Sequence, residues 1–386
     1  MDLFLINLSV NYNENSDISD NDSIDSDDTE FDIHNYRQLL SNLYPSQFMD
    51  EKAPFNSLEG LCKWASNLGY IGVQIPTLDK SIIDLDIASE SQTYCDEFKG
   101  KINSFGLEIT ELSTHIQGQL VAVHSAHDLM FDVFAPKELQ GKPKERTLWA
   151  IDQMKKAAIV SRRLGLKTHA TFSGSLLWPM MHPWPQQPKG LVETGFKELA
   201  NRWLPILNTF DDQGVDVCYE VHPVEDIHDG DTFERFLAAT GNHKRVNILY
   251  DPSHFVLQQL DYLKYIDHYH QFIKAFHVKD AEFHSTGKKG TFGGYNDWKN
   301  RAGRYRSPGD GQVDFKQVFS KLTEYGCDVW AVLEWECVIK SPAQGAKEGV
   351  TFIKNHLIET TSKKFDDFAG SEADKNEDQL KRIIGI

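Results

Sequence analysis

The sequence predicts an α/β fold of the closed (β/α)8 type, and three observations support this prediction. Short β-rich runs alternate with amphipathic helical patterns from about residue 40 onwards. About eight strand-then-helix units are present, and a closed barrel accommodates eight better than an open sheet does. Several strands also become polar on one side towards their ends, which is typical of strands that surround an active-site mouth.

The strands are predicted from runs rich in β-branched, aromatic and aliphatic residues. Seven runs are clear, and an eighth near Leu43–Phe48 is weak. In the run 215–223, Val217 and Tyr219 should face the helices, whereas Cys218 and Glu220 should face inwards. The clear runs are 69–76, 107–114, 166–174, 215–223, 246–252, 273–280 and 329–336.

The helices are predicted from apolar residues at helical spacing, with caps at several ends. Asp231 and Asp314 are expected N-caps, and Gly69, Gly165 and Gly214 are expected to end helices. The expected helices span 57–68, 90–105, 147–164, 193–213, 231–240, 258–271, 314–325 and 343–357.

Charge is unevenly spread along the 386 residues. Residues 1–36 hold ten acidic residues and no Lys or Arg, and without them the net charge of −17 falls to −7. We therefore expect residues 1–40 to be a disordered acidic extension, 41–358 a TIM-barrel catalytic domain and 359–386 a short helical tail that packs on the barrel. A chain with this charge is not expected to bind nucleic acid or an anionic membrane.

The five cysteines are scattered and odd in number, and no Cys-x-x-Cys occurs. This usage favours a reducing compartment. No stretch has the roughly 18 uncharged apolar residues of a membrane span. The start of the chain lacks the basic region of a signal peptide, so a cytoplasmic location is expected.

Four successive strands end in a residue that can bind a metal. The residues are Glu220, Asp251, His277 and Glu334. Three carboxylates and one imidazole form an oxygen-rich site suited to one divalent cation, with Mn²⁺, Mg²⁺ or Co²⁺ favoured and Zn²⁺ possible. Because clustered acids repel one another, a cation is the natural stabiliser of such a site.

Other polar residues near these strand ends have weaker signals. His115, His222 and His254 are candidates for substrate binding, although each also fits a buried, hydrogen-bonded histidine. The excursion after His277 is basic and glycine-rich, which suggests a mobile lid over an anionic or polyhydroxylated substrate, or a solvated surface loop. Its basic residues are Lys279, Lys288, Lys289, Lys299, Arg301, Arg304 and Arg306.

From about residue 47 onwards the sequence resembles the sugar phosphate isomerase/epimerase family, which has a xylose-isomerase-like barrel. The segments that carry the resemblance are 53–58 (APFNSL), 72–76 (GVQIP), 111–120 (ELSTHIQGQL), 169–174 (HATFSG), 219–223 (YEVHP), 250–254 (YDPSH), 277–280 (HVKD), 306–311 (RSPGDG) and 333–336 (LEWE). The segment at the first strand, 42–48, departs from the clean apolar run of that family.

The resemblance implies a role for each residue. Glu220, Asp251, His277 and Glu334 would bind the metal, and Glu220 and Glu334 would also exchange protons with the substrate. Glu336 shares the inward phase of Glu334 and competes for its role. The resemblance and the residues together give the predicted substrate contacts as His115, His222, His254, Lys279, Asp280, Arg306 and Glu336.

The predicted activity is isomerisation or epimerisation of a sugar or sugar phosphate by proton transfer next to a carbonyl, through an enediolate. A lyase or hydrolase acting on keto-glycosides would use the same site. The related apurinic-endonuclease phosphodiesterases need more metal ligands, and Gly303–Tyr305 stands where they have Asp-x-His. A sugar-binding module without catalysis, and a homo-oligomer, are further possibilities.

Overall fold

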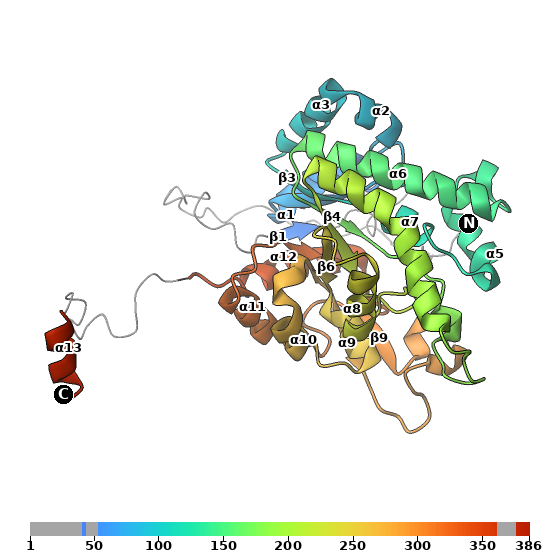
Figure 1. The fold of residues 1–386 in the computed structure, drawn as a ribbon. Coiled ribbons are helices and arrows are strands. Elements are labelled where there is room, and N and C mark those ends of the chain that lie inside the picture. The colour runs from blue at the N-terminus through green and yellow to red at the C-terminus, as the bar shows by residue number, and fades with distance from the viewer. Residues whose placement is uncertain (1–40, 44–52, 361–375) are drawn as a thin grey trace. The chain divides into compact units, whose positions relative to one another are not determined.

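The computed structural model describes residues 41–43, 53–360 and 376–386. Its parallel strands close into a barrel in the order β1-β10-β7-β6-β5-β4-β3-β2, so the predicted (β/α)8 TIM barrel is confirmed (Figure 1). The barrel strands are β1 (Ser41–Leu43), β2 (Gly72–Pro76), β3 (Glu108–Ser113), β4 (Thr168–Thr171), β5 (Asp216–Glu220), β6 (Val246–Tyr250), β7 (Ile273–Val278) and β10 (Ala331–Leu333).

The strand that closes the barrel begins earlier than expected. β1 pairs with both of its neighbours, Ser41 lying opposite Ala331 and Asn42 opposite Gly72. The rest of the run expected at 43–48 lies outside the described residues, as does the acidic extension 1–40.

Helices follow the strands and cover the barrel wall. The long helices α6 and α7 pack against each other (Figure 1). The helices of the described residues are α1 (Leu58–Leu68), α2 (Leu85–Glu90), α3 (Gln92–Asn103), α4 (His115–Gln119), α5 (Asp128–Phe131), α6 (Pro143–Leu164), α7 (Leu191–Gln213), α8 (Gly230–Ala239), α9 (Pro252–Gln258), α10 (Tyr262–Tyr269), α11 (Phe315–Glu324), α12 (Pro342–Lys354) and α13 (Glu377–Ile383).

Local side-chain chemistry sets several helix boundaries. Asp314 caps α11 as predicted, by accepting a hydrogen bond from the Gln317 backbone N–H at 3.0 Å. The expected cap at Asp231 is wrong, because Asp229 accepts the N–H of Thr232 and is itself the residue before α8. Helix α9 was not predicted.

Helix α9 starts directly after β6 because its first residues favour a helix start. Asp251 is its N-cap, and Pro252 supplies a pre-formed first helical residue. The helix ends at Gln259, which has a left-handed φ of 57°, and the predicted helix 258–271 is therefore reduced to α10.

The predicted alternation of faces along the strands is confirmed. Val217 and Tyr219 of β5 belong to the large core between strands and helices, and the Tyr219 ring packs edge-on against Trp203 of α7. The opposite face forms a small apolar layer inside the barrel, made by Ala170, Cys218, Leu249 and Ala275 of four successive strands. The site residues lie on the same inward face, one step nearer the strand ends.

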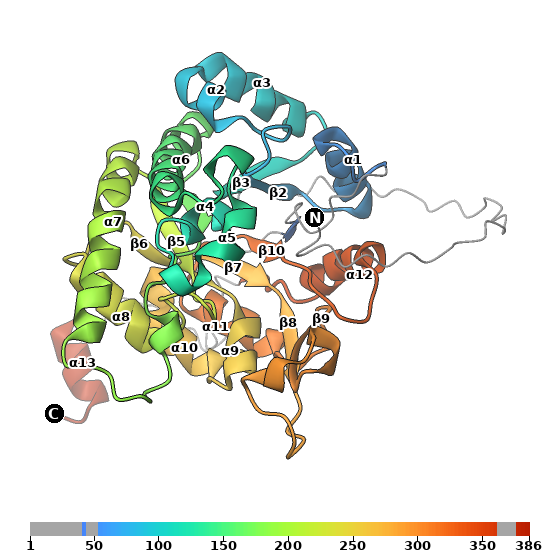
Figure 2. The same ribbon diagram turned by 90° about the vertical axis from the view of Figure 1, so that its right-hand side faces the viewer.

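Several connections at the carboxyl ends of the strands are long, among them those after β4 and β7. The excursion after β7 contains an antiparallel pair of strands, β8 (Asp280–Phe283) and β9 (Gly303–Arg306). Figure 2 shows α4, α5, α9 and this pair gathered at the same end of the barrel. The sequence predicted a flexible loop here and did not predict the two strands.

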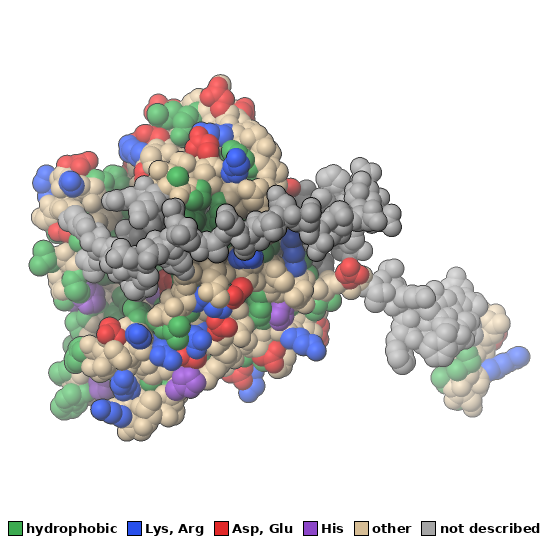
Figure 3. Space-filling model, turned by 180° about the vertical axis from the view of Figure 1, so that it is seen from behind, with side chains coloured by type: hydrophobic (Ala, Val, Ile, Leu, Met, Phe, Trp, Pro, Cys, Tyr) green, Lys and Arg blue, Asp and Glu red, His purple; other side chains and the backbone are tan. Residues whose placement is uncertain are grey.

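The face of the molecule drawn in Figure 3 carries mixed charge. Figure 3 shows basic and acidic side chains interspersed on the part of that face that the structure describes. Among the described helices, none has the length and apolar character that a membrane crossing requires. The residues of α13 are exposed, and packing of the tail 359–386 on the barrel stays a prediction.

A buried arginine holds the long connection between β3 and α6. Arg146 lies in α6 and is fully buried, and its guanidinium contacts Asp128 and Asp132 at 2.5 Å each. It thereby fixes the segment around α5, which lies at the mouth end of the barrel (Figure 2).

Replacing Arg146 with Ala should lower the free energy of unfolding by about 3–5 kcal/mol, because the two carboxylates lose a buried partner. The control Lys80→Ala breaks an exposed pair with Asp86 and should cost less than about 1 kcal/mol. Chemical denaturation of both variants measures the difference. Equal losses in the two variants would contradict the structural role of Arg146.

Candidate metal centre and active site

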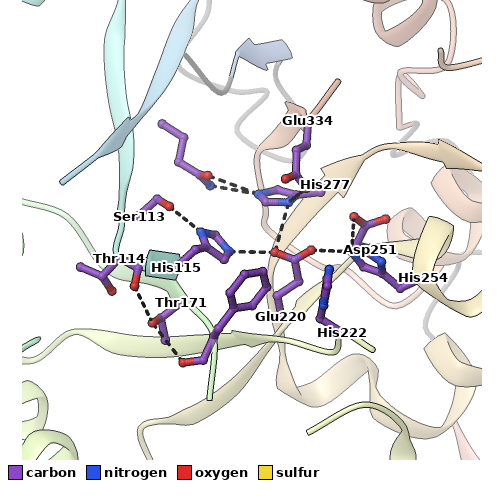
Figure 4. Close-up of polar contacts among 12 residues, drawn as sticks. Ser113, Thr114, His115, Thr171, Glu220, His222, Asp251, His254, His277 and Glu334 are labelled. Carbon is purple, nitrogen blue, oxygen red and sulfur yellow. Dashed lines mark hydrogen bonds and ion pairs between the residues drawn. The ribbon is translucent and has the colours of Figure 1, made fainter. Parts of the chain in front are cut away.

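Four ionisable side chains converge at the carboxyl ends of the strands. Glu220 ends β5, Asp251 follows β6, His277 lies near the end of β7, and Glu334 follows β10. All four are buried, and one ligand atom from each lies within 4.8 Å of the others (Figure 4). The four expected metal ligands therefore form one cluster.

The composition and geometry of this cluster fit a divalent cation. His277 Nδ1 lies 2.7 Å from Glu334 Oε2 and 3.9 Å from Glu220 Oε2. Asp251 uses Oδ1 to accept the Ser253 backbone N–H at 2.9 Å, while its buried Oδ2 points into the cluster, 3.2 Å from His254 Nε2. Three hard oxygen ligands and one imidazole match the preferences of Mn²⁺, Mg²⁺, Co²⁺ or Zn²⁺.

The Glu220 carboxylate lies between two imidazoles. Its Oε2 lies 2.7 Å from His115 Nε2, and its Oε1 lies 2.7 Å from His254 Nε2 (Figure 4). Burial alone would raise the pKa of Glu220, but hydrogen bonds from these histidines hold that pKa well below its usual range. Ser113 Oγ contacts His115 Nδ1 at 2.5 Å and orients the ring.

His254 joins Glu220 to two further groups. Its Nε2 also lies 3.2 Å from Asp251 Oδ2, and its Nδ1 lies 3.1 Å from the Tyr305 hydroxyl. Burial lowers the pKa of His254, but the nearby Asp251 carboxylate outweighs burial and raises it to about 9. The ring of His222 packs edge-on against His254 at 4.1 Å, and burial holds the pKa of His222 well below its usual range.

Lys279 lies among the carboxylates on the other side of the cluster. Its ammonium is 3.5 Å from Glu334, 3.3 Å from Glu336 and 3.9 Å from Asp251. Burial would raise the pKa of Glu334, but Lys279 lowers it to about 2. Glu334 lies in the cluster, whereas the Glu336 side chain is 38% exposed, so geometry favours Glu334 as the metal ligand.

Two of the predicted substrate contacts are engaged elsewhere. The Asp280 carboxylate accepts four backbone N–H groups, which belong to Ala281, Gly309, Gly311 and Val313. The guanidinium of Arg306 is paired with the Glu282 carboxylate at 2.6 Å. Both residues therefore hold the excursion after β7 together.

The structure adds two residues that the sequence analysis did not assign to the site. The Gln74 side-chain amide of β2 lies 3.3 Å from His277 Nε2 and 3.4 Å from Glu111. Tyr305 of β9 contacts both His254 and Lys279, whose ammonium lies 4.5 Å from the ring centre. Gln74 could have been found from its place near the end of the predicted strand 69–76. Nothing in the sequence of the glycine-rich excursion pointed to Tyr305.

The fold and the cluster define a class: a (β/α)8 barrel with a buried carboxylate–imidazole centre at its mouth. Residues 62–356 match the family described as xylose isomerase-like TIM barrel. Because this match covers well over half of the chain, the protein belongs to that family.

The curated relatives that match part of this chain are named inosose dehydratases. The inosose dehydratase of Lactiplantibacillus plantarum is 30% identical over 182 residues, which are 46% of this chain and 55% of that protein. The chain thus spans about half the length of the curated relatives that it matches.

Solved structures share the fold at low sequence identity. The 3-keto-D-glucoside 4-epimerase of E. coli has a TM-score of 0.56 at 13% identity, covering 82% of this chain and all (100%) of that one. The IOLI protein with a bound zinc atom has a TM-score of 0.52 at 16% identity, covering 82% and 96%. At these identities the likeness shows the fold alone.

The loop that carries His222 is fastened to the loop after β4. Glu225 accepts the Gly174 backbone N–H at 2.5 Å, and Asp226 accepts those of Leu176 and Leu177. Burial raises the pKa of Glu225 to about 8. At neutral pH this carboxyl group is therefore largely protonated in the folded protein.

Glu225 should make stability fall as pH rises from about 4.5 to about 8. Across this window the folded state keeps a proton on Glu225 that the unfolded state, with a pKa near 4.5, has lost, so rising pH favours unfolding. Glu225→Gln should lack this pH-dependent contribution. The difference between the free energies of unfolding of wild type and variant should therefore change between pH 4.5 and 8. Denaturant midpoints from pH 5 to 9 measure it, and a constant difference would refute the assignment.

Proposed function

We propose that the protein is a divalent-metal-dependent enzyme that removes the proton next to a carbonyl group of a sugar or keto-cyclitol. The observation that carries this proposal is the buried cluster of Glu220, Asp251, His277 and Glu334. These residues would hold one divalent cation, and the zinc atom in the related IOLI structure supports a metal at such a site. When bound, the cation supplies Lewis-acid stabilisation of negative charge on the substrate oxygens.

The two glutamates carry out the proton transfer. The depressed pKa values of Glu220 and Glu334 keep both carboxylates ionised at neutral pH, so each is available as a base. One removes the proton beside the carbonyl. In epimerisation the other glutamate must first take up a proton from solvent, which it then returns to the opposite face. In isomerisation the proton taken up by the first glutamate returns to the adjacent carbon.

Neighbouring side chains position these carboxylates. His115 and His254 hold the two oxygens of Glu220, and Lys279 approaches Glu334. His222 is half-buried beside His254 and, being neutral, can exchange hydrogen bonds with substrate hydroxyl groups. We infer that His115, His222, His254, Lys279 and Glu336 line the bound sugar.

Elimination of water is the second candidate reaction. The curated relatives are named inosose dehydratases, and dehydration next to a carbonyl starts with the same proton removal. A lyase or hydrolase acting on keto-glycosides would also begin in this way. These reactions therefore share their first step and differ only in the fate of the enediolate.

Solvent exchange tests the shared first step. The Mn²⁺-loaded protein is incubated in D₂O with a panel of ketoses, keto-glycosides and inososes, and the products are analysed by NMR. Deuterium uptake beside the carbonyl without loss of water supports epimerisation or isomerisation, and uptake with loss of water supports dehydration. Neither change with any compound would contradict the proposal.

Glu220→Gln and Glu334→Gln should each reduce turnover by roughly 10²–10⁴-fold, because each removes a proton-transfer group. Both variants should keep the wild-type circular dichroism spectrum. Glu348→Gln changes an exposed glutamate of α12 that contacts Lys340 and Gln344, outside the cluster; it is the matched control and should remain active. Near-normal rates in either active-site variant would refute its assigned role.

Cation affinity should increase with pH. Burial opposes a proton on His277, but the charge of Glu334 outweighs burial and raises the pKa of His277. Because a metal ligand must be neutral imidazole, the proton competes with the cation and weakens binding at lower pH. Calorimetric titration with Mn²⁺ from pH 6 to 9 tests this, and pH-independent affinity would contradict it.

A further inference from the structure

The turn after β9 surrounds the carboxylate of a buried aspartate. Oδ2 of Asp280 accepts the backbone N–H groups of Gly309 and Gly311, both at 2.9 Å. Its Oδ1 accepts those of Ala281 at 2.8 Å and Val313 at 3.1 Å. Four convergent N–H groups form an anion-binding nest, and Asp280 fills it.

The backbone of the turn is suited to this close approach. Gly309 has a left-handed φ of 89°, which favours glycine. A Cβ atom on Gly311 would lie 2.2 Å from Asp280 Oδ1, so only glycine fits there. Burial raises the pKa of Asp280 to about 6 against the effect of the N–H groups, so the carboxylate is mostly ionised at neutral pH.

The position of the nest in the barrel bears on the substrate. β7 is the seventh strand of the barrel in chain order, and the turn belongs to the connection after it. In TIM-barrel enzymes the connections after the seventh and eighth strands frequently bind the phosphate of the substrate. In this protein the backbone N–H groups of that connection already bind an internal anion.

Several basic side chains of the same region have internal carboxylate partners. Arg304 and Arg306 both pair with Glu282. Lys340, in the connection after β10, pairs with Asp310 at 2.7 Å. Arg304, Arg306 and Lys340 are thus engaged with carboxylates of the protein, and the carboxylates around Lys279 would repel a phosphate.

We propose that the substrate is an uncharged, unphosphorylated keto-sugar or keto-cyclitol, because Asp280 occupies the backbone nest that would otherwise bind a phosphate. This inference rests on the proposed function for the identity of the site and adds the class of substrate. The basic excursion suggested either an anionic or a polyhydroxylated substrate. This inference favours the polyhydroxylated one.

Paired ligands test the inference on the wild-type, Mn²⁺-loaded protein. Calorimetry compares a free ketohexose with its 6-phosphate. The ester should bind about tenfold more weakly or not at all, since its phosphate meets negative charge. If neither compound binds, the result is also consistent with the inference. A pocket for phosphate would bind the ester through its phosphate group even if the sugar were not the natural one. Binding of the ester as tightly as the free sugar, or more tightly, would overturn the inference.

Removing the internal anion gives a second, independent test. Asp280→Ala should free the four N–H groups, so inorganic phosphate should raise its thermal unfolding midpoint more than that of wild type. Asp314→Ala, which removes an exposed helix cap, is the control and should respond like wild type. An equal response of wild type and Asp280→Ala would overturn the inference. If Asp280→Ala does not fold, the ligand comparison decides.

The two proposals fail in different ways. Failure of the proposed function would appear as absence of deuterium uptake with all sugars. Failure of this inference would appear as tight binding of the phosphate ester, whatever the reaction.

Discussion

Repulsion among buried carboxylates is the constraint that governs the mouth of this barrel. Glu220, Asp251 and Glu334 place oxygen atoms within 4.8 Å of one another there. Such a cluster is stable only with positive charge near it. His254 and Lys279 supply part of that charge, and the ligand set suits a divalent cation that supplies the rest.

The barrel turns this constraint into a site, since parallel strands bring residues far apart in the chain to one end. The surrounding connections then fix the side chains. Asp251 caps α9, Glu225 fastens the loop that bears His222, and Asp280 holds the turn after β9. The anchors that shape the mouth are thus internal carboxyl groups.

The sequence predicted the barrel and the four clustered residues because the strand period of two determines which side chains face inwards. It could not predict what Asp280 and Arg306 contact, because their partners, Gly309, Gly311 and Glu282, come from turns and strands of an irregular excursion. Tyr305 was missed for the same reason. Helix α9 was missed because it comes after β6 without a loop.

The most direct test of the metal centre is the metal content per chain, measured by elemental analysis of protein purified without chelator. We predict about one divalent ion per chain, and a clear reduction in Glu220→Gln, which removes one ligand. No bound ion, even after addition of Mn²⁺, would contradict the metal centre and the chemistry proposed for it.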